Sequence, residues 1–346
     1  MTDVLILGGT GWLSGRIAAH ALGAGATVTC LARGGRPAPP GASLVLADRD
    51  DGAAYDVVSR TDWDHVVDVS SRADHVSAAV RALGDHAARW TYVSSMSVYR
   101  DDETVGMDES APRHPAAQTD EEYDYARQKV AAEDAVQAGV GDRALIVRPG
   151  LIVGDGDPSD RFGYWAAAFL RAGEEPVLVP PLDGRTAQVI DVDDVAAFVV
   201  STGVTGAVNA IGERHSLAEV LETVRQAVGH SGPVVVGEEE RLVAAGVQYW
   251  AGPRSLPLWL PPEMTGFMAR TNARYLASGD PPAAVRDSGA RRRRRARSRS
   301  RPRTPRRPHQ GRGAGGAVRL RDLSAHGRRR SLARLRGSDT GCRIRG

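Results

Sequence analysis

The segment YDYARQK (123–129) contains two side chains that could move a proton. Lys129 is the only lysine among the 45 lysine and arginine residues of the chain. It follows Tyr125 by four positions, so both side chains share one face of the helix that this segment predicts. A free phenol has a pKa of about 10, too high for a base at neutral pH, and a nearby ammonium group favours its ionised form. The spacing alone also arises by chance, and the alternative for Lys129 is a surface position on the helix.

A glycine-rich turn near the N-terminus predicts a phosphate-binding site, the alternative being a tight turn without a ligand. The segment VLILGGTGWLSGRIAAHAL (4–22) places Gly8 and Gly11 between an apolar strand and a helix, with Ser14 in the third glycine position. Glycine lets the backbone approach a pyrophosphate, and a helix N-terminus offers free N–H groups. The residues that we expect to contact a dinucleotide here are Gly8, Thr10, Gly11, Trp12, Leu13 and Ser70.

The end of the second expected strand indicates which dinucleotide binds. An acidic residue there would favour NAD, but the segment CLARGGR carries Arg33 and Arg36. Arginine suits a 2′-phosphate, so NADP is preferred and NAD stays possible. The alternative is that both arginines are solvated loop residues. Asp48, which ends the third strand, could contact adenine or serve as a turn carboxylate.

Short apolar runs alternate with helical patterns over the first 200 residues, as in ADHVSAAVRALGD, where Val76, Ala79, Val80 and Leu83 share one side. This alternation predicts an α/β fold, a Rossmann-type doubly wound parallel sheet covered on both faces. We expect a dinucleotide-binding domain over 1–165, to which 185–203 returns. The expected strands are 4–8, 27–31, 43–47, 65–69, 90–94 and 144–148.

A smaller C-terminal substrate lobe is expected over 166–280, where the pattern loosens. It contains an amphipathic helix over 216–229, with Ser216 as N-cap and Glu219 completing a capping box. A short strand over 232–237 follows.

Several polar and aromatic residues favour structural interpretations over chemical ones. Asp155, Asp157 and Asp160 surround a glycine and a proline, which indicates a turn and no metal site. Asp193 and Asp194 are expected to cap a helix. For Trp12, Trp165, Trp250 and Trp259, packing is favoured over lining a substrate cleft.

At this point the chain resembles the extended branch of the short-chain dehydrogenase/reductase superfamily, the NAD(P)-dependent epimerase/dehydratase family. The resemblance covers about residues 3–280 and rests on GGTGWLSG, ADRDD, YVSSMSVY, YARQK, RPGLIVGDGD and VIDVDDVA together. It implies a catalytic set of Ser95, Tyr125 and Lys129. Ser95 would hydrogen-bond the substrate oxygen, Tyr125 would donate or accept the proton, and Lys129 would reach the nicotinamide ribose.

Departures from the family pattern narrow the expected chemistry. Met96 and Ser97 follow the serine where dehydratases carry acidic residues, and Arg185 stands two positions early for an arginine that serves a nucleotide diphosphate. A nucleotide-sugar substrate is therefore disfavoured. We expect an NAD(P)-dependent reductase or dehydrogenase acting on another small molecule. The alternatives are an epimerase acting by transient oxidation and a non-catalytic NADP-binding sensor. The resemblance also implies a homodimer.

Residues 281–346 differ abruptly from the rest, with 22 arginines, no lysine and three acidic residues. Their composition predicts disorder. Three interpretations compete: the product of a reading-frame change in a GC-rich gene, which we favour, a functionless appendage, and a salt-sensitive nucleic-acid-binding tail.

The remaining composition excludes other classes. No apolar run is long enough to span a bilayer, and the N-terminus MTDVLILGG does not fit a signal peptide. Cys30 and Cys342 form no disulfide framework or metal site. These features predict a cytoplasmic protein without membrane contact, and the histidine spacing supports no metal catalysis.

Overall fold

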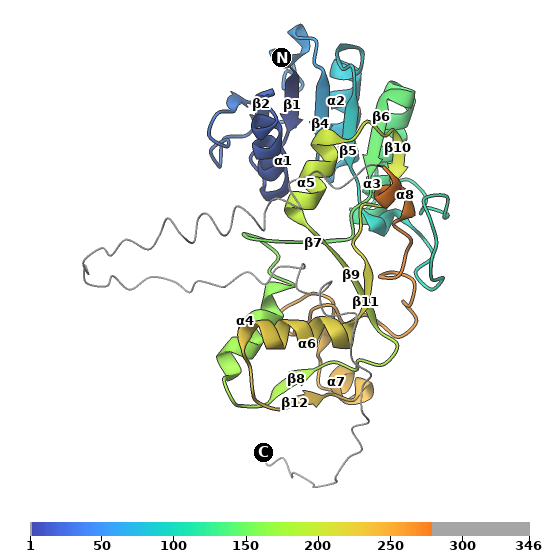
Figure 1. The fold of residues 1–346 in the computed structure, drawn as a ribbon. Helices are drawn as coiled ribbons and strands as arrows, with labels where there is room; N and C mark the ends of the chain where they lie inside the picture. The colour runs from blue at the N-terminus through green and yellow to red at the C-terminus, as the bar shows by residue number, and fades with distance from the viewer. Residues whose placement is uncertain (1, 279–346) are drawn as a thin grey trace, which may run out of the picture.

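A computed structural model describes residues 2–278 of the 346-residue chain. The arginine-rich tail predicted over 281–346 lies outside the described residues. The central element is a parallel seven-stranded sheet in the order β10-β6-β5-β4-β1-β2-β3 (Figure 1). Its strands in that order are Gly206–Val208, Ala144–Val147, Trp90–Val93, His65–Asp68, Asp3–Leu7, Thr27–Ala32 and Ser43–Leu46.

Helices cover both faces of the sheet, which confirms the Rossmann-type fold. On one face α1 (Trp12–Gly23) packs against α5 (Val192–Ser201), and on the other α2 (Ala73–Leu83) packs against α3 (Tyr125–Val140). Strand β1 shows why these strands read as continuous apolar runs. Its alternate residues enter two different cores. Leu5 and Leu7 pack toward α2 and α3, whereas Val4 and Ile6 pack toward α1 and α5.

The six strands expected from the sequence are all present, each within about two residues of its expected limits. In α2 the buried residues are Val76, Ala79, Val80 and Leu83, as its helical period predicts. The order of the strands reverses between β1 and β4. Ligands of such sheets bind at the carboxyl ends of the strands beside this reversal.

A further hydrophobic core lies below the seven-stranded sheet in Figure 1, around α4 and α6. Helix α6 begins with the predicted capping box, in which the Ser216 hydroxyl accepts from Glu219 N–H at 3.1 Å. The domain limits of 1–165 and 166–280 stay a prediction. The elements around this core are α4 (Gly163–Ala172), β8 (Val177–Val179), α6 (Leu217–Val228), β12 (Val234–Val236), α7 (Glu239–Ala244), β13 (Gln248–Tyr249) and β14 (Ser255–Leu256).

A three-stranded sheet, in the order β11-β9-β7, contributes residues both to the core around α4 and α6 and to the core beneath α1 and α5. These strands are Arg214–Ser216, Thr186–Asp191 and Leu151–Val153, and α8 (Ala273–Ala277) is the last described helix. Asp191 caps α5 by accepting from Asp193 N–H at 2.8 Å. The prediction that Asp193 and Asp194 are the caps was wrong, because the helix begins at Val192 and places both in its first turn.

Among residues 2–278, no helix combines the length and apolarity that crossing a bilayer requires.

Helices α2 and α3 meet closely enough to exclude a methyl group at Gly139. A Cβ there would lie 2.2 Å from Cγ1 of Val80, whereas a Cβ at Gly23, the last residue of α1, would meet nothing within 4 Å. Both changes to alanine gain similar helix propensity. We therefore expect Gly139→Ala to be less stable than Gly23→Ala by about 1–3 kcal/mol in urea unfolding, because overpacking forces the helices apart. Equal stabilities would contradict this packing.

Candidate active site

Three adjoining cavities follow the carboxyl ends of the sheet strands. The first, of about 810 Å³, extends from the glycine turn to the ends of β2 and β3. The second, of about 310 Å³, shares Gly8 and Gly11 with it. The third, of about 510 Å³, shares Trp12, Ser95 and Tyr125 with the second and reaches the C-terminal core. Together they form one continuous surface on which two ligands could meet.

The glycine turn is closed by the serine in the third glycine position. Gly8 adopts a φ of 81°, a left-handed conformation that favours glycine. The Ser14 hydroxyl donates to the Gly8 carbonyl at 2.6 Å and accepts from Gly11 N–H at 3.0 Å. Gly11, the N-cap of α1, has no side chain that could accept from the N–H groups of the first turn, which leaves these groups available at the cavity. The turn therefore fits a pyrophosphate.

The predicted adenosine-side residues line the first cavity, namely Gly8, Thr10, Gly11, Arg33, Asp48 and Ser70. Arg36 lines it too. Arg33 and Arg36 are both exposed and form no ion pair within residues 2–278. Both guanidinium groups are thus available to an anionic ligand. The Asp48 carboxylate accepts from Asp50 N–H at 3.2 Å, so it also closes a turn.

A buried ion pair forms the floor of this cavity and was missed by sequence reasoning. Arg49 donates to both carboxylate oxygens of Asp68, at 2.8 and 2.6 Å. Asp68 is fully buried and also accepts from Ser70 N–H at 2.9 Å. The pair therefore fixes the backbone of Ser70. The sequence signal for this pair was Asp68, an acidic residue within the otherwise apolar strand segment HVVDV.

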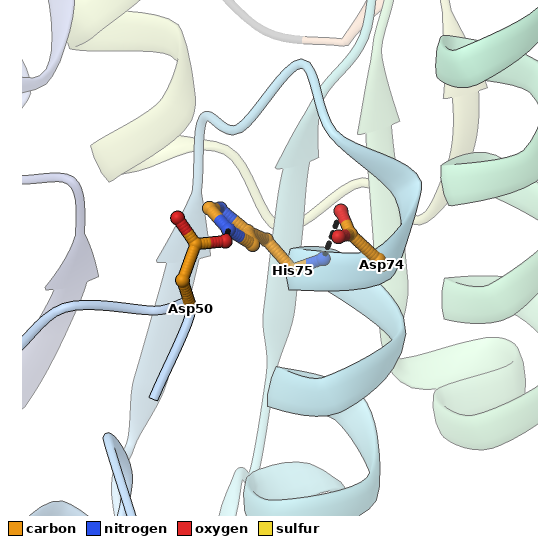
Figure 2. Close-up of side chains that lie close together, drawn as sticks. All are labelled: Asp50, Asp74 and His75. Carbon is orange, nitrogen blue, oxygen red and sulfur yellow. Dashed lines mark hydrogen bonds and ion pairs between the residues drawn. The ribbon is translucent and has the colours of Figure 1, made fainter. Parts of the chain in front are cut away.

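Figure 2 shows a second charged cluster at the rim, formed by Asp50, Asp74 and His75. The Asp50 carboxylate meets the His75 ring at 2.9 Å, while Asp74 accepts from the His75 backbone N–H. Arg72 pairs with both carboxylates, with Asp50 at 2.6 Å. The cluster is therefore an ion-pair network in which Arg72 serves both carboxylates.

Lys129 is one of the residues that line the second cavity. Its ammonium group is buried and donates to the carbonyls of Ser70 at 2.8 Å and Val93 at 2.7 Å. It also lies 4.8 Å from the centre of the Tyr92 ring. Burial lowers the pKa of Lys129 to about 7, against the opposing charges of Asp68 and Glu133. The amine thus joins the ends of β4 and β5 beneath the cavity.

Tyr125 is the first residue of α3, and it faces both the second and the third cavity. Its side chain is 43% exposed, and the Lys129 nitrogen lies 5.9 Å from its ring centre. Burial raises the pKa of Tyr125, while hydrogen bonding with Ser95 and the charge of Arg161 oppose the rise. The ammonium group turns toward two carbonyls, so by itself it does not deliver the lowered phenol pKa that the sequence suggested.

Ser95 precedes a short 3-10 helix, Met96–Val98, and caps it by accepting from Ser97 N–H at 3.1 Å. It lines the same two cavities as Tyr125. The structure thus brings the three predicted catalytic residues together around one cavity that begins at the glycine turn.

A second missed ion pair fixes α3 from its other side. Glu133, one turn after Lys129, accepts from Arg148 at 2.9 and 2.7 Å, and both residues are buried. Arg148 also donates to the Tyr99 hydroxyl at 2.8 Å, and Tyr99 donates to Asn209 at 2.6 Å. The network joins α3 to the end of β6, and the Tyr99 hydroxyl is one of its members.

The third cavity corrects the expectation for two tryptophans. Trp165 and Trp259 are fully buried, as expected for packing residues. Trp12 and Trp250 instead line the cavity. Sequence alone could not distinguish the buried tryptophans from those that line the cavity, because the burial of each indole ring depends on segments that are distant in the sequence. Asp157 accepts from Ser159 N–H at 2.8 Å, which agrees with the turn expected there.

Comparisons with known proteins place this geometry in context. A model of the NAD dependent epimerase/dehydratase family matches residues 4–203. No curated protein matches the chain.

Among solved structures, a protein from Burkholderia cenocepacia J2315 aligns with a TM-score of 0.62 and 21% identity, covering 80% of this chain and 91% of that one. UDP-N-acetylglucosamine 4-epimerase from Bacillus cereus gives 0.56 and 17%, covering 69% and 86%. The NAD complex of UDP-glucose 4-epimerase from Thermus thermophilus gives 0.53 and 19%, covering 81% and 100%. At these identities the likeness concerns the fold.

The buried amine makes stability depend on pH in a way that a variant without it would lose. The amine has its ordinary pKa of 10.5 in the unfolded chain and about 7 in the folded one. Between these values the unfolded chain binds more protons, so stability rises with pH. We expect the Tm of the wild type relative to Lys129→Met, followed by circular dichroism, to rise from about pH 7 to about pH 10. A constant difference would contradict the buried amine.

Proposed function

The chain belongs to the NAD dependent epimerase/dehydratase family, and we propose that it is an NADP-preferring oxidoreductase that reduces a carbonyl or oxidises an alcohol by hydride transfer. The observation that carries the proposal is the meeting of Ser95, Tyr125 and Lys129 in a cavity that begins at Gly8 and Gly11. A dinucleotide and a substrate oxygen could meet there beside one phenol.

The chain's own residues suit such a dinucleotide along its whole length. The backbone of the glycine turn and the first turn of α1 would hold the pyrophosphate. Arg33 and Arg36 would hold the 2′-phosphate, beside Asp48 and Ser70 at the adenosine end. Trp12 and Leu13 would border the nicotinamide half. When bound, the dinucleotide supplies or accepts a hydride at its nicotinamide ring.

Tyr125 would act as the proton donor in the reducing direction. Its raised pKa keeps the phenol protonated at neutral pH, which is the form that a carbonyl oxygen needs as it gains negative charge. Ser95 would bind the same oxygen, because it lines the cavity beside Tyr125.

Lys129 would bind the nicotinamide ribose and supply positive charge near the Tyr125 phenol. When Lys129 is protonated, two of its three donors are used by the carbonyls of Ser70 and Val93, which leaves one for a ligand hydroxyl. In the oxidising direction, its charge would help to stabilise the Tyr125 phenolate.

Epimerisation by transient oxidation is the second candidate. Solved structures of similar fold include proteins described as 4-epimerases. Such a reaction needs the same proton shuttle but consumes no dinucleotide overall. Product analysis by NMR with catalytic amounts of NADP⁺ or NAD⁺ separates the two candidates, because only an epimerase would convert substrate without net oxidation or reduction.

Removal of the Tyr125 hydroxyl tests the catalytic assignment. We expect Tyr125→Phe to bind NADPH normally but to lower the rate of NADPH-dependent carbonyl reduction by about 10²–10⁴-fold, the usual contribution of one acid–base group. Tyr123→Phe is the matched control, since this exposed tyrosine lines none of the three cavities. Unchanged turnover in Tyr125→Phe would contradict the proposal. Tight NADPH binding by a wild type that reduces no carbonyl compound would instead favour the sensor.

Cofactor preference depends on the free guanidinium group of Arg33. We expect Arg33→Ser to weaken NADPH binding by about 10- to 100-fold, the loss of one charge-assisted hydrogen bond, and to leave NADH binding unchanged. Cofactor fluorescence titration measures both affinities. Arg60→Ser, which removes an exposed arginine outside the cavity, is the control. Equal losses for both cofactors would rule out a 2′-phosphate contact.

A further inference from the structure

The third cavity presents a mostly apolar surface to whatever binds beyond Tyr125. It encloses about 510 Å³. Its apolar lining residues are Trp12, Met96, Pro149, Leu151, Ile152, Pro158, Trp250, Phe267 and Met268. A cavity of this kind binds a flat or apolar molecular body and fixes its orientation with few polar contacts.

Three aromatic rings from distant segments converge on this cavity. The rings of Trp250 and Phe267 meet edge to face, with their centres 5.7 Å apart. Trp12 is held by its indole N–H, which donates to the Asp155 carbonyl at 2.9 Å. Because each ring is fixed by other contacts, the aromatic wall is formed before any ligand arrives.

The backbone at Trp250 supports a binding role for its ring. Its φ of 62° lies in the left-handed region, which is unfavourable for a bulky residue. The Trp250 N–H donates to the Trp259 carbonyl at 2.9 Å, which holds this conformation. Strain of this kind is characteristic of residues that a binding site requires in one orientation.

Arg161 is the single basic side chain among the described residues that line this cavity. It is partly buried, and its guanidinium group lies 5.3 Å from the centre of the Trp250 ring. It forms no ion pair within residues 2–278. Arg161 and Tyr125 line the same cavity, and the charge of Arg161 opposes the rise in the pKa of Tyr125. A partly desolvated arginine without a counter-ion is suited to one anionic group.

The arginine that could have served a nucleotide diphosphate lies elsewhere. Arg185 pairs with Glu239 and donates to the Leu260 carbonyl. It lines a separate cavity of about 150 Å³. Asp157, on the wall of the third cavity, adds negative charge that a second anionic group would meet. One cation and one acid do not balance the two charges of a diphosphate.

Resting on the proposed function, we infer that the third cavity takes a compact monocarboxylate, a keto acid or its hydroxy acid with a flat apolar body, in place of a nucleotide sugar. The carboxylate binds Arg161, the body lies between the aromatic rings, and the reacting oxygen meets Ser95 and Tyr125. The carbonyl carbon accepts the hydride and its oxygen accepts the Tyr125 proton. The carbonyl is thereby reduced by two electrons to an alcohol as the dinucleotide is oxidised, and the carboxylate is unchanged.

Calorimetry on the full chain with NADP⁺ present tests this substrate class without requiring turnover. The probes are benzoylformate and 3-benzoylpropionate, whose carboxylates lie at different distances from the carbonyl, together with their methyl esters and UDP-glucose. We expect at least one acid to bind about 10- to 100-fold more tightly than its ester, as for one charge-assisted contact. UDP-glucose should bind more weakly than that acid.

The variants identify the contact. Arg161→Gln should remove the preference for the acid over its ester and leave ester binding unchanged. Arg161→Lys should keep part of this preference. The control Arg171→Gln, at an exposed arginine of α4, should keep the whole preference. Equal binding of acids and esters, failure of both acids to bind, or tighter binding of UDP-glucose would overturn the inference. The Tyr125→Phe variant tests turnover, whereas calorimetry tests binding of the acid. Failure of the catalytic proposal can therefore be distinguished from failure of this inference.

Discussion

A single buried ammonium group links the elements of the proposed site. Lys129 donates to Ser70 and Val93, which end two neighbouring strands, and it extends from the helix that begins with Tyr125. Burying an unpaired charge is costly, so the group needs its carbonyls, and the strand ends are in turn held at a fixed spacing. The wide planar fork of arginine could not enter between these two carbonyls as a compact ammonium does. This explains how a chain with one lysine comes to use it here.

Two buried ion pairs hold the segments that surround this amine. Asp68, held by Arg49, orders the backbone of Ser70 and so one carbonyl that Lys129 contacts. Glu133, held by Arg148, fixes the helix one turn beyond the lysine. Such pairs contribute little net stability, because desolvation offsets their attraction. Removing one partner, however, strongly destabilises the fold, because the other charge stays buried without a partner. Their effect is to fix one arrangement of α3 and the strand ends. In this arrangement the Tyr125 phenol faces both the second cavity, which begins at the glycine turn, and the apolar third cavity.

The sequence predicted what depends on local pattern and missed what depends on distant partners. Strand limits, the buried face of α2 and the capping box at Ser216 follow from residue periods and short-range hydrogen bonds, and the structure has them. The partnership of Arg49 with Asp68 was not predictable, since 19 positions separate the two residues. The cavity position of Trp250 depends on its contact with Phe267 and on a strained backbone. Long-range packing decided these outcomes, and no single-sequence pattern encodes it.

Because Lys129 is the only lysine, its side chain can be observed without any substitution. Lysine labelled with ¹³C at the carbon beside the amine should give one NMR signal from the chain. The account predicts that this signal titrates near pH 7, far below the ordinary 10.5, and shifts when NADP⁺ is added. A signal that titrates near 10.5 and does not respond to NADP⁺ or NAD⁺ would show an exposed amine away from the dinucleotide, and would contradict the central claim.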